Sequence, residues 1–224
     1  MLVQILFQMS LAQANQDHHG HHGHHEELQP QKGSYEETIF GVEGKWENQE
    51  GKAFTLKDIS GKPHLFAMLY TRCQTACPIL VEDVRKVVAA LPEPHRNLDV
   101  ILFSIDSEDE TQKSLAEFHK SKKLASSWTV ARANSKDVAT LAAVLGVNYK
   151  RMPDGEYVHS NSIFFVDGAG DLVAQQDGLN KVDPGFIGKI QSSLGPDTKP
   201  NFLDKTKQYF KNLFGGSKKH QHNG

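Results

Sequence analysis

Residues 64–91 read HLFAMLYTRCQTACPILVEDVRKVVAAL, and they hold both cysteines of the chain. Residues 64–70 are almost continuously apolar, which predicts a buried strand. Apolar residues then recur near the helical period over 78–91, which predicts a helix with a proline in its first turn, where a missing N–H is no loss. Cys73 and Cys77 therefore lie between the end of a strand and the start of a helix.

Strands and helices continue to alternate beyond this stretch. The sequence predicts a strand and turn over 53–63, a strand over 98–106, a helix over 108–123, a strand over 128–133, a helix over 135–146, a hairpin over 162–176 and a helix over 183–194. In helix 135–146, we expect Ser135 as the N-cap and Gly146 as the C-terminal stop. Helix 108–123 begins with acids and ends with lysines, which suits the helix dipole.

This order of elements predicts an α/β protein. Alternating strands and helices form a parallel core sheet, and the late hairpin adds an antiparallel edge. We therefore expect a thioredoxin-like fold, a central mixed sheet flanked by helices, in a domain that spans residues 38–193. The cysteine pair then lies at the carboxyl end of a central strand. Residues 194–224 form a separate tail whose apolar and lysine pattern allows two interpretations: a helix that packs back on the domain, or an amphipathic helix for a membrane surface or a partner.

Charge and composition exclude several classes of partner. The formal net charge of the 224 residues is -2, which indicates neither a nucleic-acid partner nor an acidic surface. The apolar runs are all shorter than the roughly 20 residues of a membrane span, so we expect no transmembrane helix. Residues 1–14 end in Ala-Gln-Ala after an apolar stretch and are interpreted as a signal peptide, although they contain no Lys or Arg. The protein is then periplasmic or otherwise exported, in an oxidising compartment.

Residues 15–37 form a polar, histidine-rich arm that we expect to be disordered without metal. Its six clustered histidines are His18, His19, His21, His22, His24 and His25. Imidazole pairs favour Cu(II), Ni(II) and Zn(II), so the arm is a candidate for gathering or delivering metal. The alternative is a solvated tail that binds metal only when metal is offered.

The two cysteines allow redox exchange, a metal site or a structural disulfide. A thiol at a helix N-terminus is favoured as thiolate, which is both the nucleophile of disulfide exchange and a ligand for soft metals. Redox enzymes of this fold mostly place two residues between the cysteines, whereas here there are three. A four-residue step lets two sulfurs converge on one ion and supplies half of a site for Cu(I) or Zn(II).

A third ligand should be a histidine at the same end of the sheet. His64 opens its strand at the opposite end from Cys73, and His119 falls late in a polar helix. His159 comes directly before the strand of the hairpin, in a loop that normally faces the cysteine turn of a thioredoxin-like sheet. His159 is therefore the candidate ligand, and the alternative is a loop histidine that only makes hydrogen bonds.

Three motifs give the chain a family resemblance. They are YTRCQTACP at 70–78, LDVILFSIDSEDET at 98–111 and HSNSIFFVDGAGDL at 159–172. In this order they resemble the Sco/SenC family of copper-binding proteins, which serve assembly of cytochrome c oxidase, over roughly residues 38–192. The resemblance implies that Cys73, Cys77 and His159 bind copper, as Cu(I) or Cu(II). It also implies that Asp106, in the turn after the second buried strand, lies near the site without binding the metal itself.

Several positions depart from the family pattern. Gln74, Thr75 and Ala76 stand where the family often has proline and an acid. Ser107 replaces the usual proline after Asp106, and Val158 replaces an aspartate before the histidine. These differences indicate a divergent bacterial branch.

Three functions remain open from the sequence. The leading hypothesis is a copper chaperone, not an enzyme, that delivers copper to a protein such as an oxidase subunit and needs a thiol reductant protein as a second partner. The second is a thiol-disulfide oxidoreductase that keeps a client's copper-ligand cysteines reduced. The third is a metal buffer or sensor that works mainly through the histidine-rich arm.

Overall fold

The computed structural model describes residues 28–30, 38–93 and 95–195. The predicted signal peptide, the six histidines of the arm and the helix expected in the tail lie outside the described residues. Among the described residues, no helix is both long enough and apolar enough to cross a membrane.

The described elements follow the predicted alternation. The strands are β1 (Trp46–Asn48), β2 (Ala53–Phe54), β3 (His64–Leu69), β4 (Asp99–Ser104), β5 (Trp128–Arg132), β6 (Tyr149–Arg151), β7 (Tyr157–His159), β8 (Ser162–Val166) and β9 (Leu172–Asp177). The α-helices are α1 (Ala76–Ala90), α2 (Gln112–Ser121), α3 (Ser135–Leu145) and α4 (Pro184–Leu194), and the 3-10 helices are η1 (Ile39–Gly41), η2 (Leu56–Ile59) and η3 (His95–Asn97).

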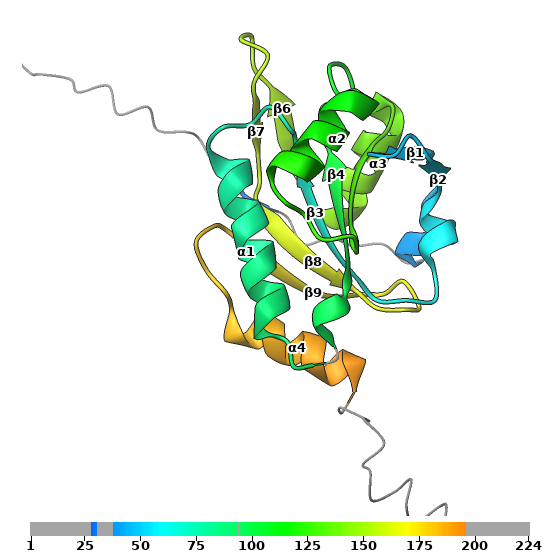
Figure 1. Ribbon diagram of the computed structural model, residues 1–224, viewed down its shortest axis with the longest axis vertical. Coiled ribbons are helices and arrows are strands. Elements are labelled where there is room, and N and C mark those ends of the chain that lie inside the picture. The colour runs from blue at the N-terminus through cyan, green and yellow to red at the C-terminus, as the bar shows by residue number, and fades with distance from the viewer. Residues whose placement is uncertain (1–27, 31–37, 94, 196–224) are drawn as a thin grey trace, which may run out of the picture.

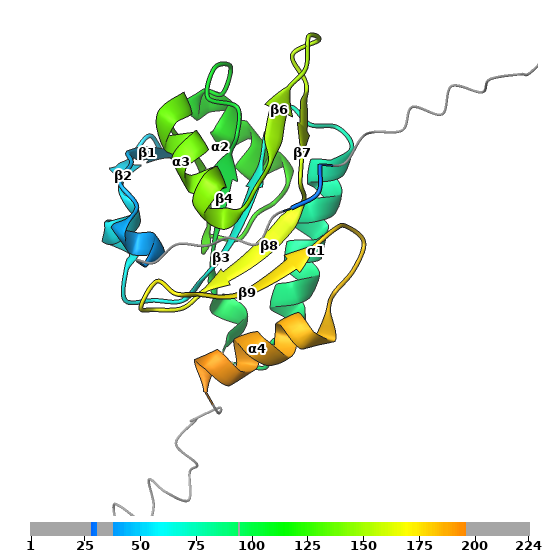
Figure 2. The same ribbon diagram turned by 180° about the vertical axis from the view of Figure 1, so that it is seen from behind.

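One mixed sheet carries the fold, in the order β2-β1-β5-β4-β3-β8-β9. Strands β3, β4 and β5 are parallel, while β8 pairs antiparallel with β3 and with β9. Both parallel connections step in the same direction across the sheet, so right-handed crossovers put α1 and α2 on one face. Helix α3 covers the other face (Figures 1 and 2). The predicted thioredoxin-like arrangement is therefore confirmed.

The core explains why β3 lies inside the sheet, between β4 and β8. All six residues of β3 are buried, because helices cover both faces of the sheet. Phe66 on β3 packs edge-on against Phe103 on β4, which in turn contacts Trp46 on β1. This packing joins β3 to its neighbours in the sheet, and the cysteines follow after the carboxyl end of β3.

The starts of α1, α2 and α3 differ from the sequence expectation in informative ways. Helix α1 begins at Ala76, before the proline, so Cys77 lies inside its first turn. Helix α3 is capped by Asn134, whose side chain accepts from the N–H of Asp137, so the prediction of Ser135 as N-cap is wrong by one residue. Both residue types are good caps, and only the backbone geometry distinguishes them.

Helix α2 begins at Gln112 rather than at residue 108. Thr111 is its N-cap, and the Thr111 and Ser114 side chains each bond the other's backbone N–H. The acids that were expected in the first turn, residues 108–110, instead form part of the loop after β4. The acidic residues before Thr111 therefore do not mark the start of α2, although acids are favourable in the first turn of a helix.

The sequence did not predict β1, β6 and β7. Each of these strands has three residues, too few to show an alternating pattern, and β6 and β7 form a separate two-stranded hairpin. The hairpin matters most, because His159 is its last residue and pairs with Tyr149. The prediction that His159 lies in a loop is therefore corrected: it ends β7 just before β8.

Candidate metal centre

The loop of residues 70–75 between β3 and α1, here called the cysteine loop, carries Cys73 just after the carboxyl end of β3. The backbone N–H of Cys77, in the first turn of α1, donates to the Cys73 sulfur over 3.3 Å. Both cysteines are free and nearly inaccessible, with exposed fractions of 4% for Cys73 and 0% for Cys77. The helix start thus directs a backbone donor at one sulfur and buries the other.

The two thiols differ strongly in acidity. A hydrogen bond from the Cys77 thiol, together with the backbone N–H groups of Cys77 and Thr75, lowers the pKa of Cys73 to about 4 against the opposing effect of burial. Burial raises the pKa of Cys77 well above its ordinary value, and the neighbouring Cys73 adds to this rise. At neutral pH the pair is therefore one thiolate, Cys73, and one thiol, Cys77.

His159 faces this pair from the hairpin. Its Nδ1 lies 3.0 Å from the carbonyl oxygen of Ser160. Since a carbonyl oxygen only accepts, Nδ1 carries the proton and Nε2 presents its lone pair. Nε2 lies 3.8 Å from the Cys77 sulfur. Nitrogen and sulfur ligands at bond lengths of about 2.0 and 2.3 Å lie roughly 3.8 Å apart around a trigonal ion, so this spacing suits a shared metal.

The three residues meet in one place without forming a finished coordination shell. Within the part of the chain that the structure describes, no three His, Cys, Asp or Glu side chains are grouped so that they could hold a metal ion as they stand. The N–H of Cys77 donates to the Cys73 sulfur, and the Cys77 sulfur lies in contact with Nε2 of His159. The donor types, two sulfurs and one imidazole, are those that copper prefers.

Asp106 ties the cysteine loop to the hairpin. Its exposed fraction is 1%, and its Oδ2 lies 2.6 Å from the guanidinium of Arg72, the residue before Cys73. Its Oδ1 accepts from the hydroxyl of Tyr157 over 3.3 Å and from the N–H of Asp109 over 3.1 Å. Asp106 therefore lies between the cysteine loop and the hairpin, the two segments that carry the candidate ligands, and its side chain bonds a residue of each.

The rim of the site is a network of ion pairs. Arg72 also pairs with Asp109 at 3.0 Å, and Arg151 of the hairpin pairs with Asp109 at 2.7 Å and with Glu108. Asp109, which was expected in the first turn of a helix, thus bridges the cysteine loop to the hairpin, and Glu108 pairs with the hairpin alone. These pairs are partly exposed and contribute little stability singly, so their effect is to orient the two segments.

Sequence reasoning missed Glu110, which is buried below the cysteine loop with an exposed fraction of 4%. Its carboxylate accepts from the N–H of Thr71 at 3.1 Å and from its hydroxyl at 2.5 Å. It also accepts from the hydroxyls of Ser104 at 2.7 Å and Ser114 at 2.6 Å. Glu110 therefore links β4, α2 and the cysteine loop. The acidic run EDE at 108–110 was the available signal, but it suggested a helix start.

Replacing Glu110 by glutamine is expected to lower the free energy of unfolding by about 2–3 kcal/mol, because an amide nitrogen would face hydroxyl and N–H donors in a buried position. For a domain of this size that corresponds to a melting temperature lower by roughly 4–12 °C in a thermal scan. The control is Glu117→Gln, an exposed residue of α2, for which we expect a change within about 0.5 kcal/mol. Equal effects of the two substitutions would contradict the assigned role of Glu110.

The other two candidate histidines lie elsewhere. His64 is buried at the start of β3, between Phe40 and Phe66, at the opposite end of the strand from the cysteine loop. His119 is half-buried, with Nε2 3.1 Å from the carbonyl oxygen of Trp128. Neither reaches the cysteines.

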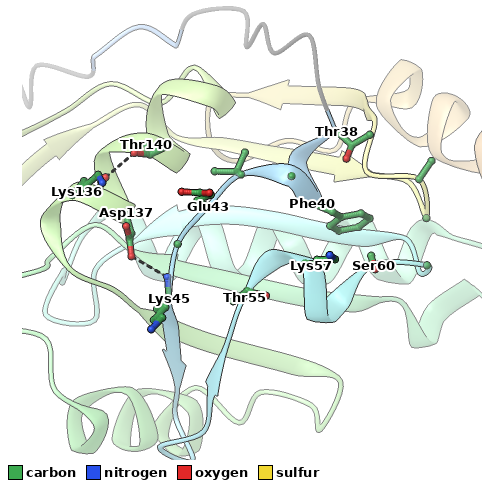
Figure 3. A pocket seen from close by; sticks show the side chains of 16 residues that line it. Thr38, Phe40, Glu43, Lys45, Thr55, Lys57, Ser60, Lys136, Asp137 and Thr140 are labelled. Carbon is green, nitrogen blue, oxygen red and sulfur yellow. Dashed lines mark hydrogen bonds between the residues drawn. The ribbon is translucent and has the colours of Figure 1, made fainter.

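A cavity of about 1130 Å³ also lies away from the cysteines (Figure 3). It is bounded by η1, η2, the first turn of α3 and the turn between β8 and β9, with Lys57, Lys136 and Asp137 among its lining residues. Asp137 accepts there from the backbone N–H of Lys45. Its lining includes Ser60 and Gly61, just before β3, and contains neither cysteine nor His159. It is therefore no part of the candidate site.

The fold and the site define a class: a thioredoxin-like protein with a CxxxC pair facing a histidine. The chain matches the SCO1/SenC family over residues 34–193, and it belongs to that family. The SCO1 protein homolog of Bacillus subtilis is 24% identical over 138 residues, 60% of this chain and 72% of the homolog.

Two solved structures share the fold. A SCO1/SenC family lipoprotein from Bacillus anthracis has a TM-score of 0.62 and 20% identity, and covers 72% of this chain and 100% of its own. ScoI of Arabidopsis thaliana, solved with copper bound, has a TM-score of 0.61 and 18% identity, and covers 68% of this chain and 99% of its own. The low identities agree with a distant position within the family.

Proposed function

We propose that the protein is a periplasmic copper chaperone that binds copper through Cys73, Cys77 and His159 and delivers it to a cuproenzyme, such as the copper A site of a terminal oxidase. One observation carries this proposal: the unprotonated Nε2 of His159 faces the Cys77 sulfur over 3.8 Å, beside the Cys73 thiolate. Family membership and the copper-bound relative support it.

Copper is cargo in this scheme, so the site has to bind it and also release it. Cys73 is already a thiolate and is the first sulfur ready to bind Cu(I). Cys77 must lose its proton to bind, so loading releases about one proton to solvent. Two sulfurs and one nitrogen leave one side of Cu(I) open, and an acceptor protein can exchange ligands there one at a time.

Redox state gates this activity. Oxidation of Cys73 and Cys77 to a disulfide removes both thiolates and therefore the metal site. In an oxidising compartment a thiol reductant protein must restore the dithiol before the next loading. Export is supported by the leader-like residues 1–14 and by the lipoprotein relative.

Replacing His159 by alanine is expected to weaken Cu(I) affinity at least about tenfold, because one of three metal bonds is lost while both thiolates remain. The measurement is a Cu(I) titration of the reduced protein against a competing chelator, with one tight equivalent in the parent. His119→Ala is the matched control, since that imidazole bonds a backbone carbonyl away from the site. An unchanged affinity in His159→Ala would refute the ligand role.

A second candidate function is supported by the acidity of the thiols. A low-pKa cysteine beside a buried thiol is the arrangement of a nucleophile and a resolving cysteine. Cys73 would attack a client disulfide, Cys77 would then displace the client thiol, and the protein would end as the Cys73–Cys77 disulfide until a thiol reductant restores it. Turnover in His159→Ala would favour this reading over copper delivery.

A further inference from the structure

The β6–β7 hairpin, which carries His159, forms a sheet of its own. It projects beyond the main sheet beside the loop that leads into α1 (Figure 1). The two cysteines, in contrast, belong to the connection between β3 and α1. The candidate ligands therefore lie on two separate pieces of structure, and the contacts that join the cysteine loop to β7 set their relative position.

Tyr70, the first residue of the cysteine loop, makes such a contact. Its backbone carbonyl oxygen accepts from the N–H of Cys73 over 3.3 Å. Its side chain is buried, with an exposed fraction of 3%, and its hydroxyl donates to Oε2 of Glu156, the residue before β7, over 2.7 Å. One residue is therefore bonded both to the turn that holds the Cys73 sulfur and to the hairpin that carries His159.

The ring of Tyr70 also packs against the imidazole. Tyr157 and His159 are two positions apart on β7, so their side chains lie on the same face of the strand. The Tyr70 ring contacts both, with its centroid 5.3 Å from that of Tyr157 and 6.1 Å from that of His159. The planes of the Tyr70 and His159 rings are 79° apart, which is an edge-to-face arrangement. The Tyr70 ring thus limits how far the imidazole can move from its place beside Cys77.

We propose that Tyr70 is a positioning residue for copper binding, which acts through His159 by holding the imidazole at the distance from the cysteine pair that a shared ion needs. This inference rests on the proposed copper site. The ring supplies the packing surface, and the hydroxyl bond to Glu156 fixes the hairpin against the cysteine loop. Because the effect passes through the His159 imidazole, it disappears when that imidazole is absent.

The test is a double-mutant cycle on Cu(I) affinity, measured with a competing chelator on the reduced full-length chain in which the six arm histidines are glutamine. Tyr70→Phe keeps the ring and removes the hydroxyl, and Tyr70→Leu removes the ring as well. Each is measured alone and together with His159→Ala. Glu156→Leu removes the acceptor from the hairpin side, while Glu156→Gln keeps an oxygen that can accept from Tyr70.

We expect Tyr70→Phe to weaken Cu(I) affinity about fivefold and Tyr70→Leu about tenfold, close to the loss in His159→Ala. With His159→Ala already present, either substitution should change the affinity by less than about twofold. Glu156→Leu should match Tyr70→Phe, and Glu156→Gln should restore most of the affinity. The matched control is Tyr149→Phe, which removes a hydroxyl from the neighbouring strand β6 and should stay within about twofold of the parent.

A spectroscopic readout separates positioning of the imidazole from a general loss of structure. With Cu(II) as the probe, the electron paramagnetic resonance spectrum of the parent should show nitrogen coupling from one imidazole. This coupling should be lost in His159→Ala, weakened in Tyr70→Leu and unchanged in Tyr149→Phe. A thermal scan of each metal-free variant shows whether it is folded.

An affinity loss in the Tyr70 variants that is the same with and without His159 would overturn the positioning role, because Tyr70 would then act on the cysteines or on the fold. Unchanged affinity in both Tyr70 variants, with His159→Ala still weakened, would also overturn it and leave the proposed function intact. A parent that binds no copper at its cysteines would overturn the proposed function and this inference together. If Tyr70→Leu does not fold, Tyr70→Phe and the two Glu156 variants decide the outcome.

Discussion

Cys77→Ser is expected to lower Cu(I) affinity by at least about 1000-fold, which corresponds to about 4 kcal/mol of binding free energy. A serine hydroxyl stays protonated at neutral pH and is a hard oxygen donor, whereas Cu(I) prefers thiolate sulfur. The loss should exceed that of His159→Ala, because the substitution removes a sulfur bond. It should also leave Cys73 as a single sulfur that cannot hold the ion with one imidazole.

The titration is best made in the background in which the six arm histidines are glutamine, so that copper on the arm does not mask the loss. Thr75→Ser is the matched control, since it retains a hydroxyl at the same helix start beside Cys73. We expect it to bind within about threefold of its parent, on the usual scale for a surface substitution. If Cys77→Ser retained full affinity, copper would have to bind elsewhere and the proposed centre would be wrong.

Alkylation of the reduced, metal-free protein is expected to modify Cys73 at a rate that barely changes between pH 5.5 and 8. Cys73 is thiolate throughout this range because its pKa is about 4, whereas an ordinary thiol reacts about tenfold faster per pH unit until it ionises. Cys77 should react at least about 1000-fold more slowly, because it is fully buried and its pKa is raised by burial and by Cys73.

The measurement is iodoacetamide labelling followed by peptide mapping at several pH values. Because a low-pKa thiolate is also a weaker nucleophile, the shape of the pH profile is more informative than the absolute rate. In Cys77→Ala the profile should move to higher pH, since the thiol that donates to Cys73 is gone. Unfolded protein should label both cysteines with an ordinary profile. A tenfold rise per unit in the folded protein would contradict the assigned acidity of Cys73.

Much of the fold was readable from residues 64–91. Six apolar residues in a row, a turn and a helical repeat predicted β3 and α1, and the alternation that follows predicted the parallel sheet. These predictions were reliable because a strand that is covered by helices on both faces must be apolar along its whole length. Helix starts were less predictable. Asn134 and Ser135 are both good caps for α3, and α2 begins after its N-cap Thr111 rather than at the acidic residues before it.

The sequence by itself determined the donor types of the candidate site and the end of the sheet at which the cysteines lie. It also singled out His159, because strand order alone brings the segment before β8 near the end of β3. These are properties of chain order and residue type, so they do not depend on exact geometry.

Only the tertiary structure decided how the three residues differ in chemistry. The helix start at Ala76 places Cys77 beside Cys73. Hydrogen bonds from the Cys77 side chain and then from its N–H lower the pKa of Cys73, while burial raises the pKa of Cys77. The hairpin β6–β7 and the carbonyl of Ser160 set which imidazole nitrogen faces the sulfur. Likewise, the role of the buried Glu110 depends on its contact with Thr71, which lies 39 residues away along the chain. Such contacts leave no local pattern, because each partner alone reads as an ordinary polar residue.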